Sequence, residues 1–74
     1  MWKDKRIKPE TKIIYSYIYA KGFNNLLLHI DIGEIQKVIR IKKVGFKKNL
    51  LILEKFKYIL FKEYDNGMYL IHIL

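Results

Sequence analysis

The chain has 74 residues and a mass of 9.0 kDa; 15 residues are Lys or Arg and 7 are Asp or Glu, so its formal net charge is +8. This length allows one small domain and excludes a two-domain enzyme with a cleft between its lobes. The absence of Cys excludes disulfides and thiolate metal sites. At 51% hydrophobic residues the chain is too apolar for a disordered basic tail, and we expect a folded core.

The sequence also bears on where the protein is found. No uninterrupted apolar stretch is longer than that at residues 50–53, which is far too short to span a membrane. The basic N-terminal residues are not followed by the apolar run of a signal peptide. We therefore expect a cytoplasmic protein that does not bind membranes.

The first part of the chain predicts a basic arm followed by a helix. Residues 1–8 carry several cations and form the arm, and residues 9–74 form the single domain. Pro9 suits the first turn of a helix, where its missing N–H costs nothing, and Gly22 suits the end of one, so a helix is predicted over residues 9–21. The helical spacing places four residues on its inner face: Ile13, Ile14, Tyr17 and Ile18.

A short strand and a second helix are predicted next. Residues 26–30 form a short apolar run bounded by turn residues, which is typical of a strand. Asp31 and Glu34 have the spacing of a capping box and predict a helix over residues 32–39. Its apolar face would consist of Ile35, Val38 and Ile39.

A third helix is predicted over residues 43–57, after a tight connection at residues 40–42. Phe46, Leu50 and Leu53 recur at i, i+4 and i+7, so they would face the core. Two short helices joined by a turn of about three residues are a candidate helix-turn-helix.

The C-terminal part changes to the period of strands. Residues 58–64 and 68–73 are rich in aromatic and β-branched side chains, and Asn66-Gly67 between them is a strong signal for a tight hairpin. The predicted fold is therefore α+β, with the order helix-strand-helix-helix-strand-strand.

Three stretches resemble a known family. They are DKRIKPETKIIY at residues 4–15, GEIQKVIRIKKVGFKKNL at residues 33–50 with LEKFKYI at residues 53–59, and YDNGMYLI at residues 64–71. Their order and spacing resemble the winged helix-turn-helix domain of plasmid and phage replication initiators, also called replisome organisers, and of related bacterial regulators. The resemblance implies binding of double-stranded DNA, in replication initiation or transcription regulation.

The chain departs from the family pattern at two positions. Arg40 stands where the family usually has a Gly in the turn, and a left-handed backbone would be less favourable for Arg than for Gly. Lys42 stands where a Ser or Thr usually caps the recognition helix, and its side chain accepts no hydrogen bond from backbone N–H groups. Both changes add positive charge at the surface expected to face DNA.

The positive charge concentrates in the turn and the third helix. Residues 40–57 contain seven Lys or Arg against Glu54 alone, a local net charge of +6. The outer side of this helix would enter the major groove, while the arm could follow phosphates and the hairpin tip could offer an amide. The expected DNA contacts are Arg40, Lys42, Lys43, Val44, Lys47 and Lys48, with Lys5 and Arg6 from the arm and Asn66 from the hairpin tip.

Gly45, near the start of the third helix, has two explanations. It would allow close approach of the backbone to a phosphate, or it is a residue near a helix end, where Gly costs little. The sequence does not decide between them.

Enzymatic and cofactor sites are not indicated. His29 and His72 are far apart in the sequence, and no paired carboxylates, Gly-rich phosphate loop or nucleophile with a nearby base is present. We expect no enzyme activity, metal, cofactor or small-molecule substrate.

Two other matters stay open. The same fold could serve as a non-enzymatic protein-interaction module, for example a small phage or plasmid protein that binds an acidic host partner. A homodimer is also open, with candidate contacts at Tyr15, Tyr19, Leu51 and residues 70–74.

Overall fold

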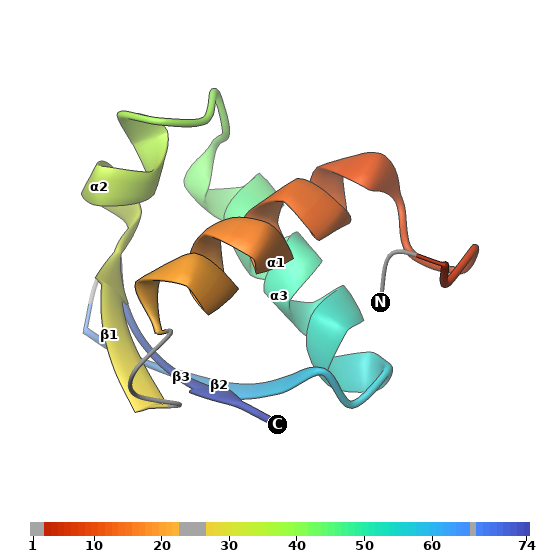
Figure 1. The fold of residues 1–74 in the computed structure, drawn as a ribbon. Helices are drawn as coiled ribbons and strands as arrows, with labels where there is room; N and C mark the ends of the chain where they lie inside the picture. The colour runs from red at the N-terminus through yellow and green to blue at the C-terminus, as the bar shows by residue number, and fades with distance from the viewer. Residues whose placement is uncertain (1–2, 23–26, 66) are drawn as a thin grey trace.

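The computed structural model describes residues 3–22, 27–65 and 67–74, and it is α+β with the predicted order of elements. The helices lie on one face of an antiparallel three-stranded sheet, and α1 crosses over α3 (Figure 1). Within these residues no helix is both long enough and apolar enough to span a membrane. The elements are α1 (Pro9–Lys21), β1 (Leu27–Asp31), α2 (Ile32–Gln36), α3 (Lys43–Lys55), β2 (Ile59–Asp65) and β3 (Met68–Ile73).

Helix α1 has the predicted bounds but a different buried face. Thr11, Ile14 and Ile18 are fully buried, whereas Ile13 is 54% exposed, so its predicted burial is wrong. Thr11 takes the inward position because α1 packs against α3 around a polar contact between Thr11 and Asn49. The prediction assumed that every inward position would be apolar.

Helix α2 begins as predicted and ends early. Both hydrogen bonds of the capping box are present: Glu34 N–H donates to the Asp31 side chain, and Asp31 N–H donates to Glu34 Oε1 at 3.3 Å. Gly33 N–H also donates to Asp31 Oδ1, at 2.9 Å. The helix stops at Gln36 instead of residue 39, and Val38 is 64% exposed instead of buried. The chain leaves the helix here and packs Ile39 and Ile41 against the core.

Helix α3 ends in a Schellman motif two residues before its predicted end. Tyr58 N–H donates to Leu53 O at 2.9 Å, and Lys57 N–H donates to Glu54 O at 3.0 Å. Lys57 adopts φ 65°, the left-handed conformation that this motif requires. The reversal directs the chain from α3 into β2.

The sheet has the order β1-β3-β2, so the last strand of the chain lies in the middle. Strands β1 and β2 begin and end close to the predicted residues, and β3 matches its predicted range. Gly67 in the turn between β2 and β3 has φ 85°, and its carbonyl oxygen accepts a hydrogen bond of 2.8 Å from Ile32 N–H. The hairpin is thereby joined to the start of α2.

The core lies between the helices and the inner face of the sheet. Phe46, Leu50 and Leu53 of α3 are fully buried, as predicted, and Phe46 meets Tyr69 edge-on with ring centroids 5.3 Å apart. The other buried members of this cluster are Ile14, Ile18, Leu28, Ile30, Ile35, Ile59, Ile71 and Ile73. Because these residues bury one side of α3, its opposite side faces solvent.

Candidate nucleic-acid interface

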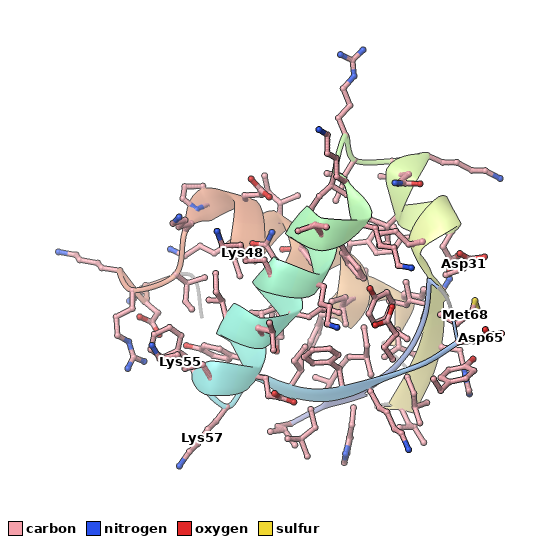
Figure 2. The ribbon with its side chains drawn as sticks, turned by 180° about the vertical axis from the view of Figure 1, so that it is seen from behind. Asp31, Lys48, Lys55, Lys57, Asp65 and Met68 are labelled. Atoms are coloured by element: carbon pink, nitrogen blue, oxygen red, sulfur yellow. The ribbon has the colours of Figure 1, made fainter. Side chains whose placement is uncertain are left out.

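The exposed side of α3 forms a continuous stripe. Val44 is 79% exposed, and the other members, at helical spacing, are also exposed: Lys47, Lys48, Leu51 and Lys55. We call these five residues the α3 stripe. Lys48 and Lys55 are seen on α3 in Figure 2, with Lys57 just beyond the end of the helix. The structure therefore gathers three of the predicted contacts, Val44, Lys47 and Lys48, on one surface.

Two more cations lie before the first turn of α3. Arg40 and Lys42 are both exposed, and Lys42 is the N-cap residue with extended backbone and no side-chain capping bond, as its chemistry predicts. Arg40 has no left-handed backbone: among the described residues Lys57 is the one non-glycine with positive φ. Arg40 therefore introduces no backbone strain in the turn before α3. Gln36 Nε2 donates to Ile41 O at 3.2 Å and links α2 to this turn.

Lys43 and Lys47 lie on the side of α3 that faces β2. Lys47 Nζ is 3.3 Å from Glu63 Oε1, and Lys43 Nζ is 3.9 Å from Glu63 Oε2. The hydrogen bond from Lys47 and the charges of both lysines lower the pKa of Glu63, so the carboxylate stays ionised. The prediction for Lys43 and Lys47 did not include this acidic partner.

Lys48 lies on the other side of the stripe, at a recess of about 220 Å³ lined also by Lys8, Glu10, Gly45, Asn49 and Ile52. The recess is held together by Asn49, whose Nδ2 donates to Glu10 Oε1 at 2.9 Å and to Gly45 O at 2.8 Å. Two cations from separate segments, Lys8 and Lys48, thus lie at one depression beside α3.

Gly45 has a packing role that neither explanation from the sequence included. A Cβ at this position would lie 3.3 Å from Ile41 Cγ1, which is tighter than ordinary van der Waals contact. The turn before α3 therefore packs closely over Gly45.

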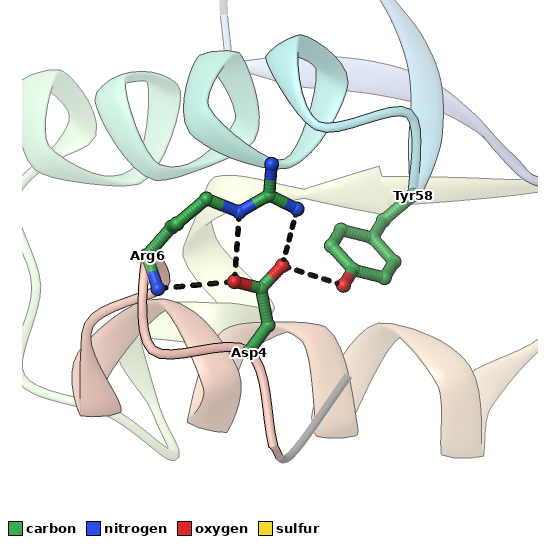
Figure 3. Close-up of polar contacts among 3 residues, drawn as sticks. All are labelled: Asp4, Arg6 and Tyr58. Atoms are coloured by element: carbon green, nitrogen blue, oxygen red, sulfur yellow. Dashed lines mark hydrogen bonds and ion pairs between the residues drawn. The ribbon is translucent and has the colours of Figure 1, made fainter.

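Residues 3–8 of the predicted arm pack onto the domain. Ile7 is buried, and the Asp4 carboxylate accepts hydrogen bonds from Arg6 Nε at 2.9 Å, from Arg6 Nη2 at 2.8 Å and from the Tyr58 hydroxyl at 2.9 Å (Figure 3). The Arg6 guanidinium also lies 4.3 Å from the centroid of the Phe56 ring. Arg6 therefore has a carboxylate partner within its own segment, although its side chain is exposed, and Lys5 is exposed as well.

This contact makes stability depend on pH. The hydrogen bonds from Arg6, followed by that from Tyr58, hold the pKa of Asp4 well below its ordinary value. The unfolded chain therefore binds a proton at higher pH than the folded chain, and the stabilisation is complete above the ordinary pKa and lost as pH falls through the folded one. We expect Asp4→Asn to lower the urea midpoint at pH 7, and the difference from the wild type to shrink below about pH 4.

Unfolding by urea at several pH values, followed by circular dichroism, measures this effect. Arg6→Ala provides the matched background, because it removes the main donor to the carboxylate. In that background the substitution Asp4→Asn should lose most of its pH-dependent effect on the midpoint. A difference between wild type and Asp4→Asn that stays constant down to pH 2 would contradict the assignment.

The β2–β3 hairpin carries less positive charge than α3 and the turn before it. Asp31 and Asp65 lie together beside Met68, their shared partner in the sheet, at the edge away from Lys55 and Lys57 (Figure 2). Asn66 lies outside the described residues, so its predicted contact has no structural description. Lys62 is exposed and lines a hollow with Leu60 and Leu70, whereas its neighbour Glu63 faces α3.

Among residues 3–22, 27–65 and 67–74, no cluster of three or more His, Cys, Asp or Glu that could hold a metal ion occurs. His29 Nδ1 lies 2.9 Å from the Tyr64 hydroxyl, and this pair is exposed on the sheet. The α3 stripe and its flanking cations are the main charged feature of this part of the chain.

Comparison of the chain with protein-family models, curated proteins and solved structures yields no match. Its function is therefore inferred from the positions of its own residues.

Proposed function

We propose that this chain is a winged helix-turn-helix protein that binds double-stranded DNA, with α3 as the recognition helix and the β2–β3 hairpin as the wing. The observation that carries the proposal is the α3 stripe: a solvent-facing helix side that presents Val44, Lys47 and Lys48 directly after Arg40 and Lys42. A recognition helix presents the residues of its first turns to the major groove.

The chemistry of these side chains indicates how DNA would be bound. Lys is a compact point charge that pairs with phosphates, and it lacks the two-pronged guanidinium that reads guanine. We expect binding dominated by the phosphate backbone, with limited base discrimination. Val44 is the exposed apolar residue of the first turn and suits contact with a thymine methyl.

The proposed biological role follows the resemblance to initiators and regulators. The chain would act without enzyme activity or cofactor, in replication initiation or transcription regulation of plasmid or phage DNA. This role implies the cytoplasm, where such DNA is found. A single small domain binds weakly, so dimerisation or a neighbouring domain would raise the affinity.

One observation favours the alternative, a protein-interaction module. The outer face of the sheet exposes Leu27 and Leu60, each about half accessible, around a shallow hollow that also includes Leu70 and His72. Apolar residues grouped on a surface are typical of a protein contact. This face and the α3 stripe are different surfaces, so the two functions are separable by mutation.

The test is a titration of a fluorescent mixed-sequence duplex with the protein at several salt concentrations. If α3 and its flanking turn neutralise about four phosphates, log Kobs falls against log[salt] with a slope of roughly −3.6. Selection from random duplexes at the same salt concentrations reports base preference. No binding at about 50 mM salt, with the folded state verified by circular dichroism, contradicts the proposal.

A further inference from the structure

Glu63 holds an unusual position in the sheet. It follows Ile59 and Phe61 at the spacing of the inner face of β2, which is turned toward the helices, and it pairs across the sheet with the fully buried Tyr69. A carboxylate at an inward position needs a cation, because burial of an unpaired charge is costly. Lys43 and Lys47 of α3 supply it.

The carboxylate is shared between the two lysines. Its Oε1 faces Lys47 Nζ at 3.3 Å and its Oε2 faces Lys43 Nζ at 3.9 Å, so each oxygen has its own ammonium group. Lys43 and Lys47 are one helical turn apart, and a DNA phosphate would meet the same pair of donors. Both side chains are about half exposed, so they are also within reach of a ligand in solvent.

We propose that Glu63 is an internal mimic of a DNA phosphate: in the free protein it engages Lys43 and Lys47, and the DNA backbone takes its place on binding. This inference rests on the proposed DNA-binding function and adds a residue that opposes it. The exchange is feasible because partly exposed Lys–carboxylate pairs contribute little to stability.

The mimic has two consequences for binding. The lysines begin paired with Glu63, so part of their attraction to DNA is offset by the loss of that pairing. Removing the carboxylate therefore strengthens DNA binding. Glu63 also keeps both lysine side chains turned toward the hairpin before DNA arrives.

The test compares two charge-matched variants, Glu63→Gln and Glu54→Gln. Both remove one negative charge, and Glu54 lies on α3 two turns beyond Lys47, so it reports the effect of net charge alone. On the fluorescent duplex at about 0.1 M salt we expect Glu63→Gln to bind about 5- to 10-fold more tightly than Glu54→Gln. Glu63→Thr, with a strand-forming side chain, serves as a second uncharged variant.

A variant without the two lysines tests whether Glu63 acts through them. In a chain carrying Lys43→Ala and Lys47→Ala, Glu63→Gln and Glu54→Gln should bind with equal affinity, because no shared cation remains. If the wild type binds DNA and Glu63→Gln gains no more than Glu54→Gln, or if the excess persists without the lysines, the mimic is refuted. If neither the wild type nor any Glu63 variant binds DNA, the DNA-binding function itself fails and the mimic with it.

Discussion

We expect the replacement of Lys42 and Lys48 together by alanine to weaken binding to a mixed-sequence duplex by roughly 50-fold at about 0.1 M salt. The two exposed lysines lie at the start of α3 and on the α3 stripe, and the ion pairs among the described residues of α3 and β2 involve Lys43 and Lys47 instead. Each phosphate contact that is lost lowers the salt slope by about 0.9, so the slope should fall by about 1.8. Fluorescence anisotropy at several salt concentrations measures both quantities.

The matched control removes two positive charges from outside the α3 stripe and its flanking turn. Lys21 forms an ion pair with Glu34, and Lys62 lines the hollow on the sheet. The variant Lys21→Ala/Lys62→Ala should keep most of the affinity, because neither residue belongs to the α3 stripe. Equal losses in the two double variants would mean that binding follows net charge alone and that α3 is not the interface.

Gly67→Ala should destabilise the domain by roughly 2–4 kcal/mol. Gly67 has φ 85°, which costs an L-residue about 1 kcal/mol, and a Cβ there would lie 2.8 Å from Ile32 Cγ2. Relief of such a clash in a packed site adds about 1–3 kcal/mol. A domain of this size has a total stability of only about 5 kcal/mol, so the substitution removes a large part of it. Urea unfolding gives the difference.

A double-mutant cycle separates the two causes. Ile32→Ala removes the methyl group that the new Cβ would meet but leaves the backbone conformation of residue 67 unchanged. The double variant should therefore be more stable than the sum of the single effects predicts, by the part that comes from the clash. Strict additivity would show that the conformation alone makes Gly67 necessary.

The local signals in the sequence predicted most of the fold. The capping box at Asp31 and Glu34 located the start of α2, and Phe46, Leu50 and Leu53 identified the inner side of α3. Such features depend on residues within one or two helical turns along the chain, so the sequence alone predicts them. The early end of α2 could not be predicted in this way, because it depends on how residues further along the chain pack into the core.

Two polar contacts had a signal in the sequence, namely polar residues at inward positions, which a search for apolar periodicity does not use. Asn49 occupies an inward position of α3, three residues after Phe46, and Thr11 occupies an inward position of α1. Glu63 likewise occupies an inward position of β2. A polar side chain at an inward position predicts a polar or charged partner, although the period alone does not identify that partner.

The hydrogen bond between Asp4 and Tyr58 has no corresponding signal in the sequence. The two residues are 54 positions apart, and Asp4 precedes the first helix, where no period applies. Of the predicted DNA contacts, the sequence therefore located the α3 residues by their period, while the surroundings of Arg6 required the three-dimensional structure. The binding role of all of them stays a prediction.

The position of β3 between β1 and β2 also sets the order in which the domain can form. Among the described strands, β1 pairs with β3, which follows both other strands in the sequence. The β2–β3 hairpin is local and can form quickly, whereas pairing with β1 requires closure of a long loop that contains α2 and α3. During synthesis β1 therefore stays unpaired until residues 68–73 have left the ribosome. The sheet against which α3 packs is complete only then.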